Sequence, residues 1–300
     1  MNYLIGLTAF PKKPRKNKLC YDELIMMKKY FLIALASLTI GIAPLSTHAN
    51  TFVVSQKSLE FDEYPYESCG ETCPEIDYSF IDTGYNWLDA IINKDVVLGL
   101  SGYIEEGSSE DKEWQAFKNI KNPTDKQLAN QTTKAIKKFS NENTEWIKED
   151  KDNSPFSMRS VPNYLGNKQL KNGNHLELFS INNYQYLGGA HGLPTLGYYV
   201  FDMNNKKLLE LDDVVISGKK SILEKLAYEA YIKYLLDNDV NPDDMAETWE
   251  FYLTDNFSFN KDGITFLYQP YAIGPYAMGM PELTIKYQDL KGVIKAEYLD

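Results

Sequence analysis

The side chains that most often carry out catalysis or hold metal ions are scarce in this sequence. The 300 residues include three His and three Cys. Neither His175 nor His191 lies in an HExxH motif, and the sequence contains no GxSxG, P-loop or GxGxxG motif. We therefore predict no catalytic residue, no metal site and no cofactor.

Carboxylates are the exception, because acidic residues occur in adjacent pairs. A glycosidase needs two carboxyl groups that flank a cleft, and sequence alone cannot place two of these pairs across one. Asp212 and Asp213 precede a predicted helix, so we expect them to cap it. The alternative of a periplasmic enzyme that modifies glycan or peptidoglycan with carboxylates stays open. The pairs are Glu105-Glu106, Asp212-Asp213 and Asp243-Asp244.

A glycine-rich segment, residues 188–192, carries one of the histidines. His191 could act there as a base or ligand on a tight loop. The alternative is a hairpin turn in which glycines supply positive φ angles and His191 fixes the loop through hydrogen bonds. We favour the turn, which makes a structural loop of Gly188, Gly189, His191 and Gly192.

Residues 271–279 combine Tyr, Pro, Gly and Met between two predicted strands. Tyr offers a large contact area with few torsions to freeze, and Pro limits the entropy lost on binding. A crossover with buried aromatic side chains is the alternative, and the sequence does not decide between them. The predicted partner-binding residues are Tyr271, Pro275, Tyr276 and Met278.

The N-terminus has the pattern of a cleavable secretory signal. Two lysines follow Met26 and Met27, an apolar run of about 16 residues comes next, and small residues at 47 and 49 precede the expected cleavage near Ala49. The run is shorter than the about 20 residues that a spanning helix needs, so we expect no stable membrane span. We interpret residues 1–25 as a non-native extension and 26–49 as the signal peptide, and we expect a periplasmic or secreted protein.

Export affects how the cysteines and the charge are interpreted. Cys20 precedes the signal, which leaves Cys69 and Cys73 as a predicted disulfide; free thiols and metal or redox chemistry are the alternatives. The whole chain has a net charge of −11, and residues 1–49 contribute +5, so the exported part carries −16. Such a charge argues against nucleic acid and anionic lipid and favours a cationic partner, although it also serves simple solubility.

In the remaining sequence the helices are segregated from the strands and hairpins dominate, with an Asn-Gly turn at residues 172–173; this pattern predicts an α+β fold with antiparallel sheets. Residues 99–121 look like a polar surface loop, and Thr124 or Asn122 is the expected cap of the long helix after Pro123. We place an N-terminal strand and helix region at 50–153 and a C-terminal α+β domain at 154–300. Predicted strands are 51–63, 75–82, 157–170, 175–187, 195–203, 256–260, 263–269 and 282–287; predicted helices are 86–98, 123–150, 219–236 and 243–249, with a short turn at 287–292.

In its C-terminal half the chain resembles the RsiV-like family, bacterial extracytoplasmic proteins that carry a domain of unknown function numbered 3298. The resemblance rests on residues 186–192, on Phe201-Asp202, on residues 208–214 and on residues 257–279. A region like domain of unknown function 4163 matches more weakly before it. The resemblance implies an α+β fold without established catalysis. One branch of the family is an anti-sigma factor that binds lysozyme, and another precedes a peptidoglycan deacetylase domain.

Together these features predict an exported, non-enzymatic protein of the cell envelope. The expected partner is lysozyme or a similar cationic cell-wall hydrolase, or peptidoglycan itself. The alternatives are the carboxylate enzyme described above and a membrane-retained sensor of envelope stress.

Overall fold

The computed structural model describes residues 52–61, 73–101, 104 and 106–299. The predicted signal peptide and Cys69 lie outside the described residues. The chain divides into two compact units, Met1–Asn50 and Thr51–Asp300, and the description below concerns the second. Among the described residues, no helix is both long enough and apolar enough to cross a membrane.

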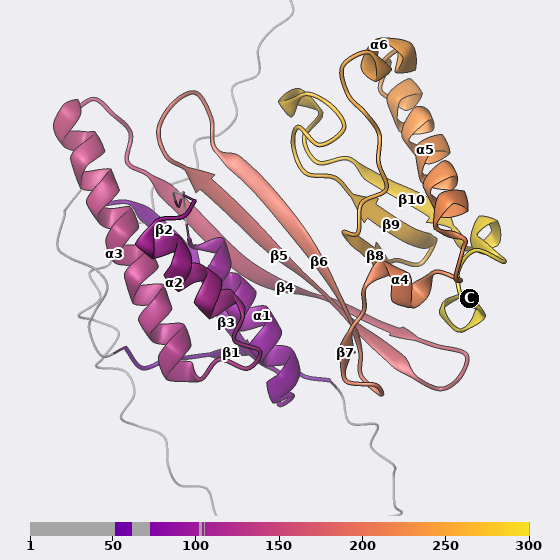
Figure 1. Ribbon diagram of the computed structural model, residues 1–300, viewed down its shortest axis with the longest axis horizontal. Coiled ribbons are helices and arrows are strands. Elements are labelled where there is room, and N and C mark those ends of the chain that lie inside the picture. The colour runs from indigo at the N-terminus through magenta and orange to yellow at the C-terminus, as the bar shows by residue number, and fades with distance from the viewer. Residues whose placement is uncertain (1–51, 62–72, 102–103, 105, 300) are drawn as a thin grey trace, which may run out of the picture. The chain divides into compact units, whose positions relative to one another are not determined.

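A five-stranded sheet is the scaffold of the second unit (Figure 1). The strand order is β2-β4-β5-β6-β7, and all pairs are antiparallel except β2 with β4. The Asn-Gly turn predicted between β4 and β5 is present, and Gly173 supplies a φ of 84° there. The strands are β2 (Glu75–Tyr78), β4 (Ser157–Gln169), β5 (His175–Tyr186), β6 (Leu193–Asp202) and β7 (Lys207–Leu208). The predicted α+β class is therefore confirmed, with one parallel pairing added.

Successive residues of β5 contribute to two different hydrophobic cores. Leu176 and Leu178 belong to a core built with the C-terminal elements, whereas Phe179 and Ile181 belong to a core built with the N-terminal helices. Neighbouring side chains of a strand point to opposite faces of a sheet, so β5 serves both cores at once. The predicted boundary at 153 thus falls between β2 and β4 of a sheet that both cores share.

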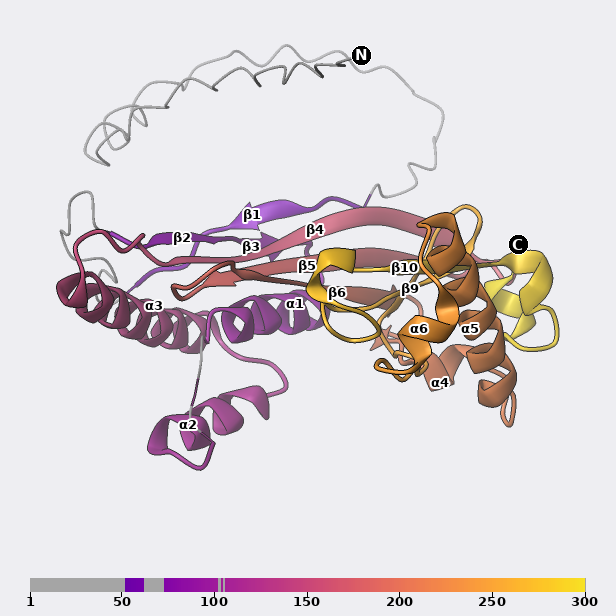
Figure 2. The same ribbon diagram turned by 90° about the horizontal axis from the view of Figure 1, so that it is seen from above.

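Three helices pack on the N-terminal core: α1 (Asn86–Gly99), α2 (Ser109–Lys118) and α3 (Asp125–Glu149). Figure 2 shows α1 and α3 running along the strands of the large sheet. The predicted helices at 86–98 and 123–150 are confirmed. The predicted loop at 99–121 is wrong, because α2 buries Trp114 and Phe117 one turn apart. A helix with so narrow an apolar stripe looks like a polar loop in sequence.

The predicted strand at 75–82 is two strands in different sheets. Residues of β2 join the large sheet, whereas β3 (Phe80–Asp82) pairs with β1 (Ser55–Lys57). Ser55–Lys57 is also all that forms a strand among the described part of the predicted range 51–63. Apolar alternation continues through residue 79, so the sequence pattern alone gives no sign of the change of partner.

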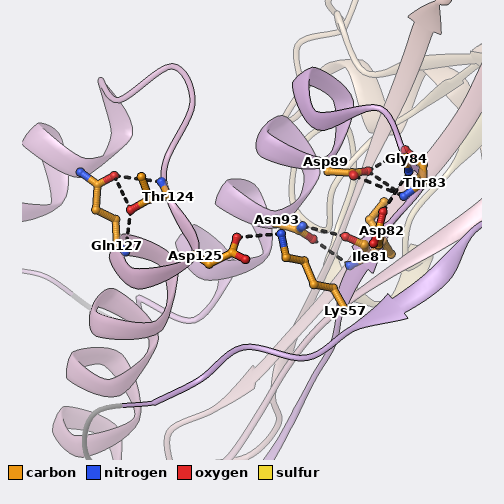
Figure 3. Close-up of polar contacts among 10 residues, drawn as sticks. All are labelled: Lys57, Ile81, Asp82, Thr83, Gly84, Asp89, Asn93, Thr124, Asp125 and Gln127. Carbon is orange, nitrogen blue, oxygen red and sulfur yellow. Dashed lines mark hydrogen bonds and ion pairs between the residues drawn. The ribbon is translucent and has the colours of Figure 1, made fainter.

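Buried polar side chains fix α1 to β3 (Figure 3). Asn93 accepts from the backbone N–H of Ile81 at 2.9 Å and donates to its carbonyl at 2.9 Å. Asp89 accepts from the Thr83 hydroxyl at 2.6 Å and from the Thr83 N–H at 3.1 Å. Burial raises the pKa of Asp89, and the Thr83 bonds oppose that rise. We call Ile81, Thr83, Asp89 and Asn93 the helix clamp.

The predicted cap of α3 is confirmed at Thr124. Its side chain accepts from the Gln127 N–H at 3.2 Å, and the Gln127 side chain accepts from the Thr124 N–H at 2.9 Å. This reciprocal pair is a capping box. Lys57 of β1 forms an ion pair with Asp125 at 2.7 Å, which ties the first strand to the start of α3.

The C-terminal elements build a second, three-stranded antiparallel sheet in the order β10-β9-β8. The prediction that Asp212 and Asp213 cap the helix after them is wrong, because that helix, α5, has no side-chain cap within the described part of the chain; Asp213 instead accepts at 2.9 Å from the N–H of Glu210, the N-cap residue of the one-turn helix α4. The elements are α4 (Leu211–Val214), α5 (Lys220–Asp237), α6 (Pro242–Ala246), β8 (Phe257–Phe259), β9 (Gly263–Leu267), β10 (Glu282–Lys286) and the 3-10 turns η3 (Tyr276–Met278), η4 (Tyr287–Leu290) and η5 (Ala296–Tyr298). The strands β8, β9 and β10, the helices α5 and α6 and the turn η4 match the predicted elements to within a few residues, whereas α4, η3 and η5 were not predicted.

Candidate functional site

The two loops that the sequence singles out meet in the folded protein. The His191 ring stacks on the Tyr276 ring, with centroids 3.9 Å apart and planes 19° apart. The Tyr276 hydroxyl donates to the Gly192 carbonyl at 2.8 Å. These contacts join residues 188–192, at the β5–β6 turn, to residues 271–279, between β9 and β10. We call the joined loops the two-loop surface.

The glycine loop owes its course to close packing and to positive φ angles. Gly188 and Gly189 have φ angles of 89° and 88°. A Cβ atom on Gly188 would lie 2.7 Å from the Trp146 ring, and one on Gly192 would lie 2.3 Å from the Tyr184 hydroxyl oxygen. Only glycine fits such sites without displacing a neighbour. His191 is exposed, and its Nδ1 lies 3.1 Å from the Gly192 carbonyl.

The tyrosine loop is anchored from beneath. Ile273 and Gly274 are buried, and the Tyr231 hydroxyl of α5 donates to the Ile273 carbonyl at 2.5 Å. Gly274 packs so closely on Met278 and Met245 that a Cβ atom there would lie 2.3 Å from the Met278 sulfur. The loop is therefore held in one conformation by α5 and α6.

The outer side of the same loop is open. The Tyr271 side chain is 49% exposed at a φ of 67°, an unusual angle for a residue other than glycine. Pro275 is exposed, while Tyr276 and Met278 are half-buried. The loop thus has a packed inner side, as expected for a buried crossover, and an exposed aromatic outer side. The binding role of these four residues remains a prediction.

Trp249 also lies beside this surface, although no sequence motif pointed to it. Its ring lies 6.5 Å from that of Tyr271, which in turn lies 5.6 Å from Tyr276. Trp249 follows α6 directly, and no spacing pattern links it to residues 271–279. Exposed carboxylates surround it along the chain, at Asp243, Asp244, Glu247 and Glu250. The chain on both sides of Trp249 is therefore acidic.

Two other carboxylates lie away from solvent, each held by a tyrosine. Glu177 accepts from the Tyr164 hydroxyl at 2.6 Å, and its Oε1 lies 3.6 Å from Nε2 of His175. Burial raises the pKa of Glu177. Burial, together with the hydrogen bond to Glu177, raises the pKa of Tyr164 to about 12. Burial likewise raises the pKa of Asp95 on α1, and a hydrogen bond from the Tyr199 hydroxyl of β6 partly offsets this rise. Among the described residues, no group of three or more His, Cys, Asp or Glu is placed to hold a metal ion.

The predicted disulfide falls partly outside the described residues. Cys73 is disulfide-bonded, but Cys69 lies in the range 62–72, so its pairing with Cys73 remains a prediction.

Comparisons with known proteins relate the chain to a family without an assigned activity. Residues 212–288 match the family described as "Protein of unknown function (DUF3298)". Over 123 residues, 40% of this chain, it is 28% identical to the peptidoglycan-N-acetylmuramic acid deacetylase PdaC of Bacillus subtilis. The match covers only 26% of that relative, so the chain spans about a quarter of its length.

Two solved structures share the fold. A DUF3298 family protein from Pseudomonas aeruginosa superposes with a TM-score of 0.56 at 22% identity, covering 82% of this chain and 95% of that one. A member of the same family from Bacteroides fragilis gives a TM-score of 0.50 at 20% identity, covering 82% and 92%. The expected likeness to domain 4163 and to the RsiV branch remains a prediction. The tyrosine loop, α5, α6 and the strands β8 to β10 lie within residues 212–288, the segment that matches the DUF3298 family.

Proposed function

We propose that this protein is a non-enzymatic component of the cell envelope that binds a cationic cell-wall hydrolase such as lysozyme through the two-loop surface. The observation that carries the proposal is the His191–Tyr276 stack, because it converts two separate loops into one aromatic surface. Aromatic residues held rigid near the centre of a contact supply much of the binding energy in protein complexes.

Charge supports a basic partner. The expected exported part carries a net charge of −16, and exposed acidic residues flank Trp249 along the chain. Opposite charge speeds the encounter of two proteins and is screened by salt. The deacetylase PdaC acts on peptidoglycan by its name, which supports placing the present protein in the envelope, in the periplasm or outside the cell.

Biolayer interferometry with immobilised protein and soluble lysozyme, at low and moderate salt, tests the proposal. We expect binding that weakens with salt. Tyr271→Ala should weaken it by about tenfold or more, as expected for an exposed aromatic anchor. Tyr85→Ala is the matched control, because Tyr85 is 42% exposed but lies at the start of α1. Failure to bind at both salt concentrations would remove lysozyme as the partner.

The same protein sample separates binding from catalysis. A binding protein leaves purified peptidoglycan unchanged, whereas the competing carboxylate enzyme would release acetate or soluble fragments. Such release, lost in a Glu177→Gln variant, would replace the proposal with an enzymatic function.

The exported location has its own test. We expect the protein recovered from the periplasm or medium to begin at Asn50 by mass spectrometry. An intact N-terminus in the membrane fraction would favour the membrane-retained sensor instead.

A further inference from the structure

The β8–β10 sheet has one apolar and one polar face. Its apolar face packs in the C-terminal core through Phe257, Phe259, Ile264, Phe266, Leu283 and Ile285. The opposite face carries a row of hydroxyl groups, one from each strand, at Ser258, Thr265 and Thr284, which are register partners. A sheet that faces only protein core would not need such a row.

This polar face forms part of a cavity of about 570 Å³. The end of the β4 strand and Tyr198 of β6 form the remaining wall. The volume lies within the range of about 300–1,000 Å³ that is usual for small-molecule sites. Polar side chains dominate the lining, notably Asn167, Gln169, Tyr198, Ser258, Asn260 and Glu282.

One group in the wall has no partner. Ser258 is 4% exposed, and its hydroxyl makes no hydrogen bond within the described part of the chain. By contrast, Thr265 opposite it accepts from the Asn260 amide at 2.7 Å and pairs with the Thr284 hydroxyl at 2.7 Å. A buried hydroxyl without a partner costs free energy, which a ligand hydroxyl could recover.

The other polar groups are fixed in place before any ligand arrives. The Tyr198 hydroxyl donates to Glu282 at 3.2 Å, and its backbone N–H donates to the Asn256 side chain at 2.8 Å. The Lys168 ammonium lies 4.4 Å from the centre of the Tyr287 ring. Preorganised hydrogen-bonding groups lower the entropy cost of binding a small polar molecule.

We propose that this cavity binds a short neutral oligosaccharide. Amide and hydroxyl side chains offer the donors and acceptors that sugar hydroxyls need, and Tyr198 adds aromatic surface to the lining. The lining carries Lys168 and Lys261 against Glu282, a net charge of only +1, and the Lys168 ammonium already lies over the Tyr287 ring, so a ligand without a net charge suits the cavity. None of the lining residues belongs to the two-loop surface, so this site is separate from the proposed protein contact.

Isothermal titration with two neutral trisaccharides, chitotriose and cellotriose, tests the proposal. We expect at least one to bind, and Ser258→Ala and Gln169→Ala each to weaken that affinity by about fivefold, the equivalent of one lost hydrogen bond. Gln169 is exposed, so its replacement leaves the fold intact. Asn163→Ala is the matched control on the same strand, because Asn163 is exposed outside the cavity lining.

The outcomes separate this site from the lysozyme proposal. Tyr271→Ala should leave the sugar affinity unchanged while it weakens lysozyme binding. If neither trisaccharide binds at millimolar concentration, or if the bound one is insensitive to both cavity variants, the proposal is overturned.

Discussion

The helix clamp and the cavity beside β8 treat buried polar groups in opposite ways. In the clamp, the side chains of Asn93 and Asp89 bond to the backbone of β3 and of the turn after it. In the cavity wall, Thr265 has partners, but Ser258 has none among the described residues. This difference indicates that the clamp stabilises the fold, whereas the Ser258 hydroxyl in the cavity wall is available to bond a ligand.

The largest expected effect comes from removing the clamp. Asn93→Ala leaves the N–H and C=O of Ile81 buried without partners, so it should lower the free energy of unfolding by about 3 kcal/mol. Urea titration followed by circular dichroism measures the change. Asn163→Ala, an exposed residue, should stay within about 0.5 kcal/mol of the parent protein. Equal effects of the two variants would show that the clamp is not structural.

The second-largest loss of stability is expected from a substitution that overpacks the glycine loop of the two-loop surface. In Gly192→Ala the new methyl group lies 2.3 Å from the Tyr184 hydroxyl oxygen, so a loss of about 1–3 kcal/mol follows from overpacking. The double variant with Tyr184→Leu should recover part of that loss, because the shorter side chain makes room. Additive losses in this double-mutant cycle would contradict the packing explanation.

Buried carboxylates give a pH-dependent effect of intermediate size. The raised pKa of Asp95 means that the folded protein binds a proton more tightly there than the unfolded chain does. Stability from this group is therefore full below its ordinary pKa of 3.8 and falls as pH rises through the raised pKa, by at most about 1.4 kcal/mol per pH unit.

Asp95→Asn should flatten this part of the stability profile, while the amide oxygen still accepts from Tyr199. Thermal unfolding between pH 4 and pH 8 in about six steps measures the slope for both proteins. The exposed Asp237→Asn is the control and should leave the slope unchanged. A profile for Asp95→Asn identical to that of the parent would refute the assignment.

The smallest expected effect falls in the cavity wall. Ser258→Ala removes a hydroxyl that has no partner, so stability should stay the same or rise by less than about 1 kcal/mol. Thr265→Val, directly opposite in register, removes bonds to Asn260 and Thr284 and should cost about 1–2 kcal/mol. Calorimetry of the two variants measures both changes in stability. A larger loss in Ser258→Ala than in Thr265→Val would contradict the contrast between the cavity wall and the clamp.

Signals between residues close together in the sequence were sufficient to predict most of the helices and strands. The Asn-Gly turn between two strand-like segments predicted β4 and β5, and Thr124 was one of the two expected caps at the start of α3. These signals are short-range, since each depends on residues a few positions apart. The same short range explains why α2 was missed and why β2 and β3 were merged.

What the sequence determined by itself was the α+β class, the scarcity of catalytic and metal-ligating side chains, the acidic charge and the two unusual loops. Only the tertiary structure decided that these loops touch, because the Tyr276–Gly192 hydrogen bond joins residues 84 positions apart. It also placed Trp249 beside Tyr271 and left Ser258 without a partner. Such contacts depend on how two sheets and a helix pack together, which no local pattern of residues encodes.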